Sequence, residues 1–257
     1  MPNTHGSFIW YELLTTDADA AAAFYGEVIG WDAAPAGVAG VDYRLFSAAG
    51  QDVAGHMNIP DEGAEMGMRP GWHGFIGVDD VDAAVAAIEA EGGGVIMPAM
   101  DIEGVGRMAL LTDLQHVPFY VMRGASDEAS TSFAAQLGHC VWNELSAADQ
   151  DAALSFYTAQ FGWEKGEAMP MGDRGNYVFL HHGGEMIGAV MRDAGDGPLP
   201  MWRFYFAVPD IDVAAAAVAS AGGTLGLGPH PIPGGDFKLV ATDPQGALFG
   251  AVGPRKA

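Results

Sequence analysis

The sequence contains a single cysteine, Cys140, and only 11 lysine and arginine residues among its 257 positions. One cysteine excludes an intramolecular disulfide and a cysteine-rich zinc site. Apolar runs stay below the ~20 residues that a membrane-spanning helix requires. The first residues also lack the basic start and the apolar core of a signal peptide. These absences predict a cytoplasmic protein.

Positive charge is scarce, and 33 aspartate and glutamate residues give a formal net charge of −22. A surface this acidic repels phosphate backbones and anionic lipid head groups, so neither nucleic acid nor a membrane surface is expected as a partner. Apolar residues make up 49% of the chain, which is a globular composition. The charge favours a cationic small-molecule ligand, although it can also serve solubility alone.

The chain repeats itself. The tetrapeptide WYEL at 10–13 recurs as WNEL at 142–145, and FY at 24–25 recurs at 156–157, both at an offset of 132 residues. Later matches, such as TD at 112–113 and 242–243, follow at an offset of 130. Chance does not hold so many matches in register. We infer two homologous domains, 1–123 and 138–257, joined by a linker at 124–137.

Each domain divides again into two modules. Residues 8–14 alternate in the manner of a strand, and Thr16 or Asp17 precedes a helix that ends at Gly30. A Pro- and Gly-rich break at 60–71 leads to a second strand, and a second helix starts at Asp80. With the short strands that follow each helix, the pattern predicts an α+β chain of four βαβββ modules.

Four such modules, with Phe-Tyr at 24–25 plus Gly-Trp at 30–31 around the end of the first helix, Val-Asp-Asp-Val-Asp at 78–82 and Thr-Asp-x-Gln at 112–115, resemble the vicinal oxygen chelate superfamily. This group includes glyoxalase I, bleomycin-resistance proteins and extradiol dioxygenases. The resemblance covers nearly the whole chain. It implies two tandem glyoxalase-like domains whose modules form two cup-shaped sheets. In the family each cup often holds one divalent metal, while the chemistry varies widely.

The resemblance also implies where metal ligands would stand. In this sequence those positions hold Trp10, Gly55, His73 and Tyr120 in the first domain, and Trp142, Gly188, Arg203 and Gly250 in the second. Only His73 is a good ligand, and an indole nitrogen can only donate a hydrogen bond. Because a divalent ion needs several oxygen or imidazole donors, we expect no metal cofactor. His56 and His73 are the weak candidates for a metal in the first domain.

Tryptophan at these positions gives each cup a flat aromatic face. Strand periodicity places Glu12 beside Trp10, and Glu144 beside Trp142. The expected ligand-binding residues are Trp10, Trp142, His73, Phe75, Tyr120, Cys140, Arg203 and Tyr205, with Glu144 and Glu12 as candidate catalytic residues. The structural alternative is that the tryptophans fill a ligand-free core and the acids pair with arginine or the backbone.

Two functions of different class follow. The first is a metal-free binding protein of the bleomycin-resistance type, for an aromatic or cationic metabolite or antibiotic. The alternative is a glyoxalase-like lyase or another enzyme that uses a cavity glutamate as general base, with or without a divalent metal. An interaction protein with collapsed cups is a third hypothesis. In each case we expect a monomer with pseudo-dimeric domains or a weak homodimer.

The pairing of modules decides which side chains share a cup. We expect each cup to join distant modules, the first with the fourth and the second with the third. This arrangement predicts that Glu12 meets Arg203 and that Glu144 is left as the unpaired acid. Glu144 is then expected to hold a ligand cation or to act as a base.

Overall fold

The structure is a computed structural model that describes residues 3–38, 40–193 and 200–256. The first half of the chain contains β1 (Phe8–Thr15), α1 (Ala18–Val28), β2 (Asp32–Pro35), β3 (Arg44–Ala48), β4 (Gln51–Asn58), α2 (Asp61–Glu65), β5 (Gly71–Gly77), α3 (Val81–Ala90), β6 (Gly94–Ile102), β7 (Gly106–Thr112) and β8 (Pro118–Gly124). Two βαβββ modules are present here, as predicted.

The second half repeats this order. It contains β9 (Cys140–Ala147), α4 (Gln150–Phe161), β10 (Glu164–Pro170), η1 (Gly172–Arg174), β11 (Asn176–His182), β12 (Glu185–Arg192), β13 (Met201–Ala207), α5 (Ile211–Ser220), β14 (Thr224–Pro231), β15 (Phe237–Thr242) and β16 (Leu248–Gly253). We number the modules one to four; they begin at β1, β5, β9 and β13. The predicted α+β class with tandem domains is confirmed.

Each half of the chain contributes one eight-stranded sheet. The strand orders are β2-β3-β4-β1-β5-β8-β7-β6 and β10-β11-β12-β9-β13-β16-β15-β14. Within each module the first strand pairs in parallel with the last, with Glu12 opposite Gly55 and Asn143 opposite Gly188. Each sheet therefore unites two successive modules.

Aspartate begins each of the four long helices. The carboxylate of Asp17 accepts the amide of Ala20 at 2.9 Å, and Asp80 accepts that of Ala83 at 3.0 Å. Asp149 and Asp210 cap α4 and α5 in the same way. Such a cap satisfies an amide that the helix itself leaves open and contributes ~1 kcal/mol. Of the two predicted starts of the first helix, Thr16 and Asp17, the structure has Asp17, and the start predicted at Asp80 is confirmed.

Two elements in the first half differ from the expectation. The Pro- and Gly-rich break holds the short helix α2, where the sequence predicted no regular structure. The exposed strand β2 pairs with β3 and was not located from the sequence. Its residues, DAAP, have neither the alternation nor the β-branched side chains by which strands are recognised.

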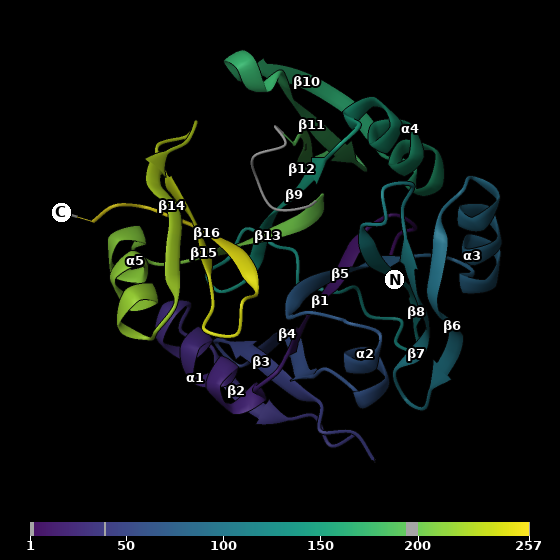
Figure 1. The fold of residues 1–257 in the computed structure, drawn as a ribbon, viewed down its shortest axis with the longest axis horizontal. Helices are drawn as coiled ribbons and strands as arrows, with labels where there is room; N and C mark the ends of the chain where they lie inside the picture. Colours follow the sequence, from purple (N-terminus) through teal and green to yellow (C-terminus); the bar gives the residue numbers. More distant parts are fainter. Residues whose placement is uncertain (1–2, 39, 194–199, 257) are drawn as a thin grey trace. The chain divides into compact units, whose positions relative to one another are not determined.

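The chain forms two compact units, and each combines modules from both halves. Unit 1 comprises Met1–Ile9, Gly74–Ser130 and Trp142–Arg203, and unit 2 comprises Trp10–His73, Thr131–Val141 and Phe204–Ala257. Unit 2 thus holds most of modules one and four, and in it α1 packs against α5 (Figure 1). Unit 1 holds most of modules two and three, and in it α3 contacts α4.

The core of unit 2 contains a buried hydrogen-bond chain. Trp72 donates to the hydroxyl of Tyr25 at 2.8 Å, and that hydroxyl donates to Asp243 at 3.2 Å. Asp243 also accepts the amides of Gln245 and Ala247. Burial raises the pKa of the Tyr25 hydroxyl and of the Asp243 carboxyl. The Phe-Tyr motif of module one therefore meets the Thr-Asp motif of module four.

Unit 1 contains the same kind of chain, with Tyr157 from module three, Asp113 from module two and Trp202 from the first strand of module four. Trp202 donates to Tyr157 at 3.0 Å, and Tyr157 donates to Asp113 at 3.2 Å. Asp113 accepts two turn amides, and burial raises its pKa. The motifs that signalled the family resemblance thus hold each unit together internally.

The prediction that each cup joins distant modules is wrong for the sheets. Modules one and four do share unit 2, and modules two and three share unit 1. Each sheet, however, is built from successive modules. The repeated motifs indicate which modules pack together within a unit. Which side chains share one face of a sheet depends instead on which strands are hydrogen-bonded to each other.

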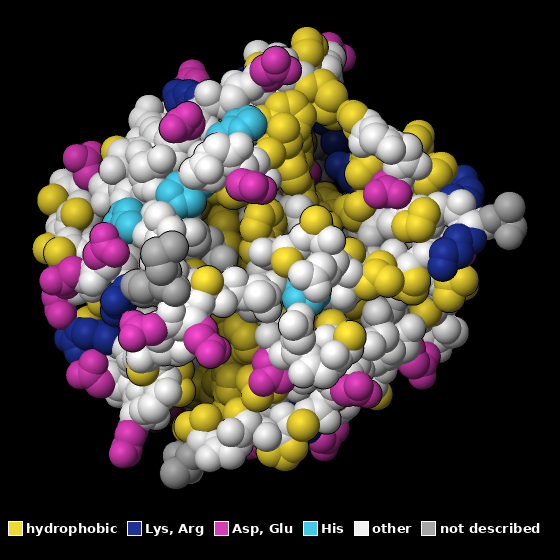
Figure 2. Space-filling view, turned by 180° about the vertical axis from the view of Figure 1, so that it is seen from behind, with side chains coloured by type: hydrophobic (Ala, Val, Ile, Leu, Met, Phe, Trp, Pro, Cys, Tyr) yellow, Lys and Arg dark blue, Asp and Glu magenta, His cyan; other side chains and the backbone are white. Residues whose placement is uncertain are grey.

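The surface matches the acidic composition. On the face seen in Figure 2, Asp and Glu side chains are scattered widely and Lys and Arg are few. Among the described residues, no helix is long and apolar enough to cross a membrane.

Candidate functional site

A buried ion pair lies at the centre of the first candidate site, within unit 1. Arg203 Nη1 donates to Glu144 Oε1 at 2.6 Å, and Tyr177 donates to Glu144 Oε2 at 2.8 Å. Trp142 Nε1 in turn donates to the Tyr177 hydroxyl at 2.7 Å. We call Trp142, Glu144, Tyr177, Phe179 and Arg203 the Glu144 cluster. Glu144 is 1% exposed and uses both carboxylate oxygens, so its negative charge is compensated inside the protein.

Aromatic rings flank this ion pair. The Trp142 and Tyr177 rings are nearly parallel, at 9° with centroids 6.5 Å apart. Phe179 stands edge-on to Trp142 at 5.9 Å and to Tyr177 at 5.5 Å. Trp142 and Phe179 are only half-buried. The cluster therefore offers flat apolar surface next to a guanidinium.

Strand geometry explains why these residues meet. Trp142 and Glu144 are two apart on β9 and so share a face of the sheet. Arg203 lies on β13, the neighbour of β9 in the sheet order. A Cβ atom at Gly188 on β12 would stand 1.9 Å from the carbonyl oxygen of Asn143. Glycine at this position is thus required by the close approach of β12 to β9.

Unit 2 contains an equivalent arrangement, the Glu12 cluster, formed by Trp10, Glu12 and Tyr43; His73 lies on β5, the strand next to β1, at the repeat position that corresponds to Arg203. Trp10 Nε1 donates to the Tyr43 hydroxyl at 2.9 Å, and that hydroxyl is hydrogen-bonded to the Glu12 carboxylate. Burial, together with the charge of Glu12, raises the pKa of Tyr43 well above its ordinary value. A Cβ atom at Gly55 would stand 2.0 Å from the Tyr43 oxygen, so glycine makes room for the tyrosine.

The two clusters differ at one repeated position, which holds His73 in module two and Arg203 in module four. His73 is buried, and burial lowers its pKa to about 4, opposed only by a backbone interaction with Gly71. The imidazole is therefore neutral at pH 7. One cluster carries a permanent cation at this position and the other a neutral ring.

This geometry corrects the expected pairing of the acids. Arg203 was predicted to meet Glu12, and the structure shows it paired with Glu144. The prediction that Glu144 is the unpaired acid is wrong for the same reason. The cause is the sheet order, which makes β13 a neighbour of β9.

The remaining predicted residues are Phe75, Tyr120, Tyr205 and Cys140. Phe75 and Tyr120 stack in unit 1, with centroids 4.1 Å apart at 11°. Tyr205, in unit 2, occupies the space above Gly250, where a Cβ atom would stand 2.1 Å from the ring, and Lys238 Nζ lies 5.7 Å from the ring centroid. Cys140 is buried in unit 2, at the start of β9.

His56 faces away from the Glu12 cluster. Its neighbour Gly55 lies under Tyr43, and successive strand residues point to opposite faces. The imidazole is fully buried and stacks on Phe46 at 4.0 Å and 16°. Burial lowers its pKa to about 4, with nearby Arg44 acting in the same direction. His56 and His73 are therefore not arranged as two ligands of one ion.

The divalent metal implied by the resemblance does not fit the residues present. Six of the eight expected ligand positions hold Trp, Gly or Arg, and none of these residues supplies an anionic oxygen or an imidazole. The other two positions hold His73 and Tyr120. Aromatic groups also fill the space above two of the glycines, Tyr43 above Gly55 and Tyr205 above Gly250. Within the ranges that the structure describes, no group of three or more His, Cys, Asp or Glu could hold a metal ion.

Sequence reasoning missed Tyr43 and Tyr177, the hydrogen-bond bridges of the two clusters. Tyr43 precedes β3, and Tyr177 lies at the start of β11. Each precedes the glycine of its own module, Gly55 or Gly188. A tyrosine at corresponding places in both halves was the available signal, but the shift in offset between the halves obscured it.

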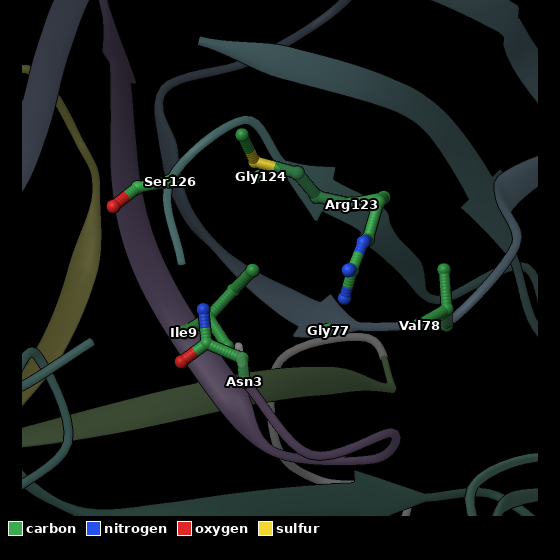
Figure 3. Close-up of a pocket in the computed structure, with 8 residues that line it drawn as sticks. Asn3, Ile9, Gly77, Val78, Arg123, Gly124 and Ser126 are labelled. Atoms are coloured by element: carbon green, nitrogen blue, oxygen red, sulfur yellow. The ribbon is translucent and has the colours of Figure 1, made fainter. Parts of the chain in front are cut away.

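A small surface pocket lies elsewhere in unit 1 (Figure 3). It is lined by Asn3, Ile9, Gly77, Val78, Met122, Arg123, Gly124 and Ser126. Its empty volume, open solvent included, is about 210 Å³, below the ~300 Å³ at which small-molecule pockets begin. The predicted site residues do not line it.

Comparison with known proteins places both halves of the chain in one group. The model of the Glyoxalase/Bleomycin resistance protein/Dioxygenase superfamily matches residues 7–119 and 136–250. A Mycobacterium tuberculosis protein, CFP32, provisionally named a glyoxylase, is 37% identical over 95% of this chain and 94% of its own length. The anthracycline biosynthesis protein DnrV of Streptomyces peucetius is 30% identical over 96% of this chain and 93% of its own.

Solved structures show the same fold at low identity. The Mn(II)-bound glyoxalase from Novosphingobium aromaticivorans aligns with a TM-score of 0.63 at 20% identity, over 99% of this chain and 83% of that one. The 2,2',3-trihydroxybiphenyl 1,2-dioxygenase from Sphingomonas wittichii aligns with a TM-score of 0.64 at 14% identity, over 98% of this chain and 91% of that one.

Proposed function

The chain belongs to the Glyoxalase/Bleomycin resistance protein/Dioxygenase superfamily, and we propose that it is a metal-independent binding protein for a planar aromatic small molecule. The observation that carries this proposal is the filling of metal-ligand positions by aromatic side chains in both halves. Trp10 and Trp142 stand at such positions and are each held by a tyrosine, Tyr43 or Tyr177. A fixed indole offers a stacking surface at little entropic cost.

Two further features support an aromatic, oxygen-bearing ligand. Half-buried Trp142 and Phe179 lie in the same cluster as a guanidinium, and planar ligands with a few polar groups suit such a lining. The relative DnrV is named for anthracycline biosynthesis, and anthracyclines are polycyclic aromatic compounds. The net charge of −22 supports a small molecule rather than a polyanion as the partner.

Catalysis by a general base is the alternative, and the Glu144 cluster gives it less support. Both oxygens of Glu144 already accept short hydrogen bonds, one from a cation, so taking a proton from a substrate would disrupt one of these bonds. Glu12, which accepts a hydrogen bond from Tyr43, is the second candidate base. One relative is provisionally named a glyoxylase, and catalysis is therefore kept as the alternative.

The test is a binding titration on protein treated with a chelator. We expect 2-(hydroxymethyl)anthraquinone, a neutral planar probe, to quench tryptophan fluorescence saturably, and Trp142→Phe or Trp10→Phe to remove a large part of the quenching. Trp163→Phe is the matched control, because that indole is buried and bonded to the Gly6 carbonyl. Absence of saturable binding, or binding only after Mn²⁺ is added, would contradict the proposal.

A further inference from the structure

The small pocket of unit 1 lies where the N-terminal segment, the end of β5, and β8 with the residues that follow it meet. Its polar side chains are those of Asn3, Arg123 and Ser126, drawn as sticks in Figure 3. The empty volume of about 210 Å³, open solvent included, is too small for a polycyclic molecule. It leaves room for a group of a few heavy atoms, because one water molecule occupies ~30 Å³.

Asn3 and Ser126 offer hydrogen-bond donors to this pocket. Asn3 Oδ1 accepts the amide of Ser130 at 2.7 Å. Because a backbone N–H can only donate, this bond fixes the side-chain oxygen of Asn3 toward Ser130 and leaves the Nδ2 donors for another partner. Ser126 Oγ accepts the amide of Glu128 at 3.0 Å, so its hydroxyl hydrogen is also left to donate.

Arg123 brings a half-buried positive charge to the same pocket. It stands directly opposite Arg107 in the antiparallel pair of β7 and β8, so both side chains leave the same face of the sheet. Arg107 is compensated by Asp82 and Asp101, at 2.8 and 3.0 Å. Within the ranges that the structure describes, Arg123 has no ion pair with a carboxylate. Because like charges opposite each other destabilise a sheet, an anion beside Arg123 would be stabilising.

The acids near this pocket restrict the charge of the anion. Asp79, Asp127 and Glu128 follow lining residues closely in the sequence, and all three are exposed. Together with the net charge of −22, they disfavour an anion of charge −2 more than one of charge −1. A carboxylate group therefore matches the pocket better than a phosphate group.

We propose that this pocket binds the carboxylate group of a small organic acid. Arg123 supplies the charge and a planar fork of donors, which matches the two oxygens of a carboxylate. Asn3 Nδ2 and the Ser126 hydroxyl supply further donors. The site is independent of the proposed function, because its residues belong to neither the Glu144 cluster nor the Glu12 cluster. It is specific to the first half of the chain, since the second half has Gly253 at the position of Arg123.

Two measurements on the full chain test the proposal at fixed pH and ionic strength. The probes are acetate, the neutral acetamide of the same shape, and inorganic phosphate. We expect acetate to raise the midpoint of thermal unfolding saturably, because a ligand that binds only the folded state stabilises it, and acetamide to leave the midpoint unchanged. In ¹H–¹⁵N spectra, acetate should shift the backbone amides of Gly77, Val78 and Gly124, which line the pocket.

Substitutions then assign the response to this pocket. Arg123→Gln should weaken acetate binding at least tenfold. Asn3→Asp keeps an acceptor for the Ser130 amide but replaces the Nδ2 donors by a carboxylate oxygen, so it should weaken acetate binding to a similar extent. Arg107→Gln is the matched control, because it removes the same charge from the opposite residue of the strand pair, outside the pocket lining. It should bind acetate as the unmodified protein does.

Each outcome decides the proposal. Saturable binding of acetate that Arg123→Gln and Asn3→Asp weaken, and that Arg107→Gln retains, supports it. An equal loss in Arg107→Gln would show a response to overall charge and overturn it. A response to phosphate without a response to acetate, a response to acetamide equal to that of acetate, or no saturable response would overturn it as well.

Discussion

Glu12 and Glu144 occupy the same position in the repeat, yet the residues at the matching positions around them differ in charge. Each accepts a hydrogen bond from a tyrosine that is itself fixed by a tryptophan. Only Glu144 has an arginine at the third position, where its counterpart has the neutral His73. The duplication has kept the hydrogen-bond scaffold and changed one charge. Because the difference lies in a single charged residue, single substitutions can test the effect of that charge.

Removing the cation from the Glu144 cluster should have the largest effect. Arg203→Met leaves a buried carboxylate without its counter-ion, which should lower the free energy of unfolding by about 3–5 kcal/mol. His73→Met at the matching position removes a neutral ring and no charge, and should cost less. Urea denaturation of both variants measures the difference. Equal losses would show that the Arg203 charge is not compensating Glu144.

The double variant sharpens this comparison. Arg203→Met/Glu144→Gln removes both charges and should recover most of the stability lost in Arg203→Met. A double variant no more stable than Arg203→Met would mean that the arginine acts through packing alone.

The buried histidines of the first half predict a loss of stability in acid. The pKa of His56 and of His73 lies at about 4 in the folded protein, against 6.5 for an ordinary histidine, because burial disfavours the charged ring. Between these values the unfolded chain binds protons that the folded chain does not, so stability is full above pH 6.5 and falls as the pH approaches 4. Each histidine contributes up to ~3 kcal/mol to this loss.

The variant His56→Ala isolates one of them and matches the second half, which has Ala189 at this position. Its stability should fall less steeply than that of the unmodified protein between pH 6.5 and 4, even if its stability at neutral pH is lower. His230→Ala, at an exposed position, is the control. In both proteins, the burial of Asp113 and Asp243 changes stability in the opposite direction near pH 4. The stability of the unmodified protein is therefore subtracted from that of His56→Ala at each pH. Identical slopes would contradict the account of His56.

The tyrosine bridges should be equivalent in the two halves. Tyr177→Phe and Tyr43→Phe each leave a tryptophan N–H and a buried carboxylate without a partner that they now have. Each should lower the free energy of unfolding by about 1–3 kcal/mol. Thermal and urea unfolding measure both. A much smaller loss at Tyr43 would show that the scaffold is not shared.

Exposed ion pairs should give the smallest effect. Arg107 donates to Asp82 and Asp101 at the surface, where solvent and salt screen the attraction. Arg107→Met should leave the free energy of unfolding nearly unchanged, in contrast to Arg203→Met. A comparable loss in the two variants would mean that burial does not set the strength of the Arg203 pair.

The fold was largely predictable because it depends on local patterns that occur twice. Asp17 and Asp80 precede their helices, and the repeated Phe-Tyr and Thr-Asp motifs revealed the modules. The exposed strand β2 was missed because DAAP carries no strand pattern. Tyr43 escaped notice because it precedes a short strand and belongs to no motif.

The site was less predictable because its contacts join strands that are distant in sequence. Trp10 and Trp142 were identified from the ligand positions that the resemblance implies, and strand alternation then added Glu12 and Glu144. Which of the acids meets Arg203 depends on the hydrogen-bonded neighbours of β9, and the repeat does not encode them. The offsets revealed which modules correspond, whereas the sheet order determines which side chains touch.

The most direct test of the central claim observes the two tryptophans themselves. Protein labelled with 5-fluorotryptophan has six fluorine resonances, and Trp10→Phe and Trp142→Phe assign two of them. In chelator-treated protein, titration with 2-(hydroxymethyl)anthraquinone should shift the Trp10 and Trp142 resonances and leave the four others in place. Resonances that stay fixed throughout, or that shift only after Mn²⁺ is supplied, would contradict metal-independent binding at these clusters.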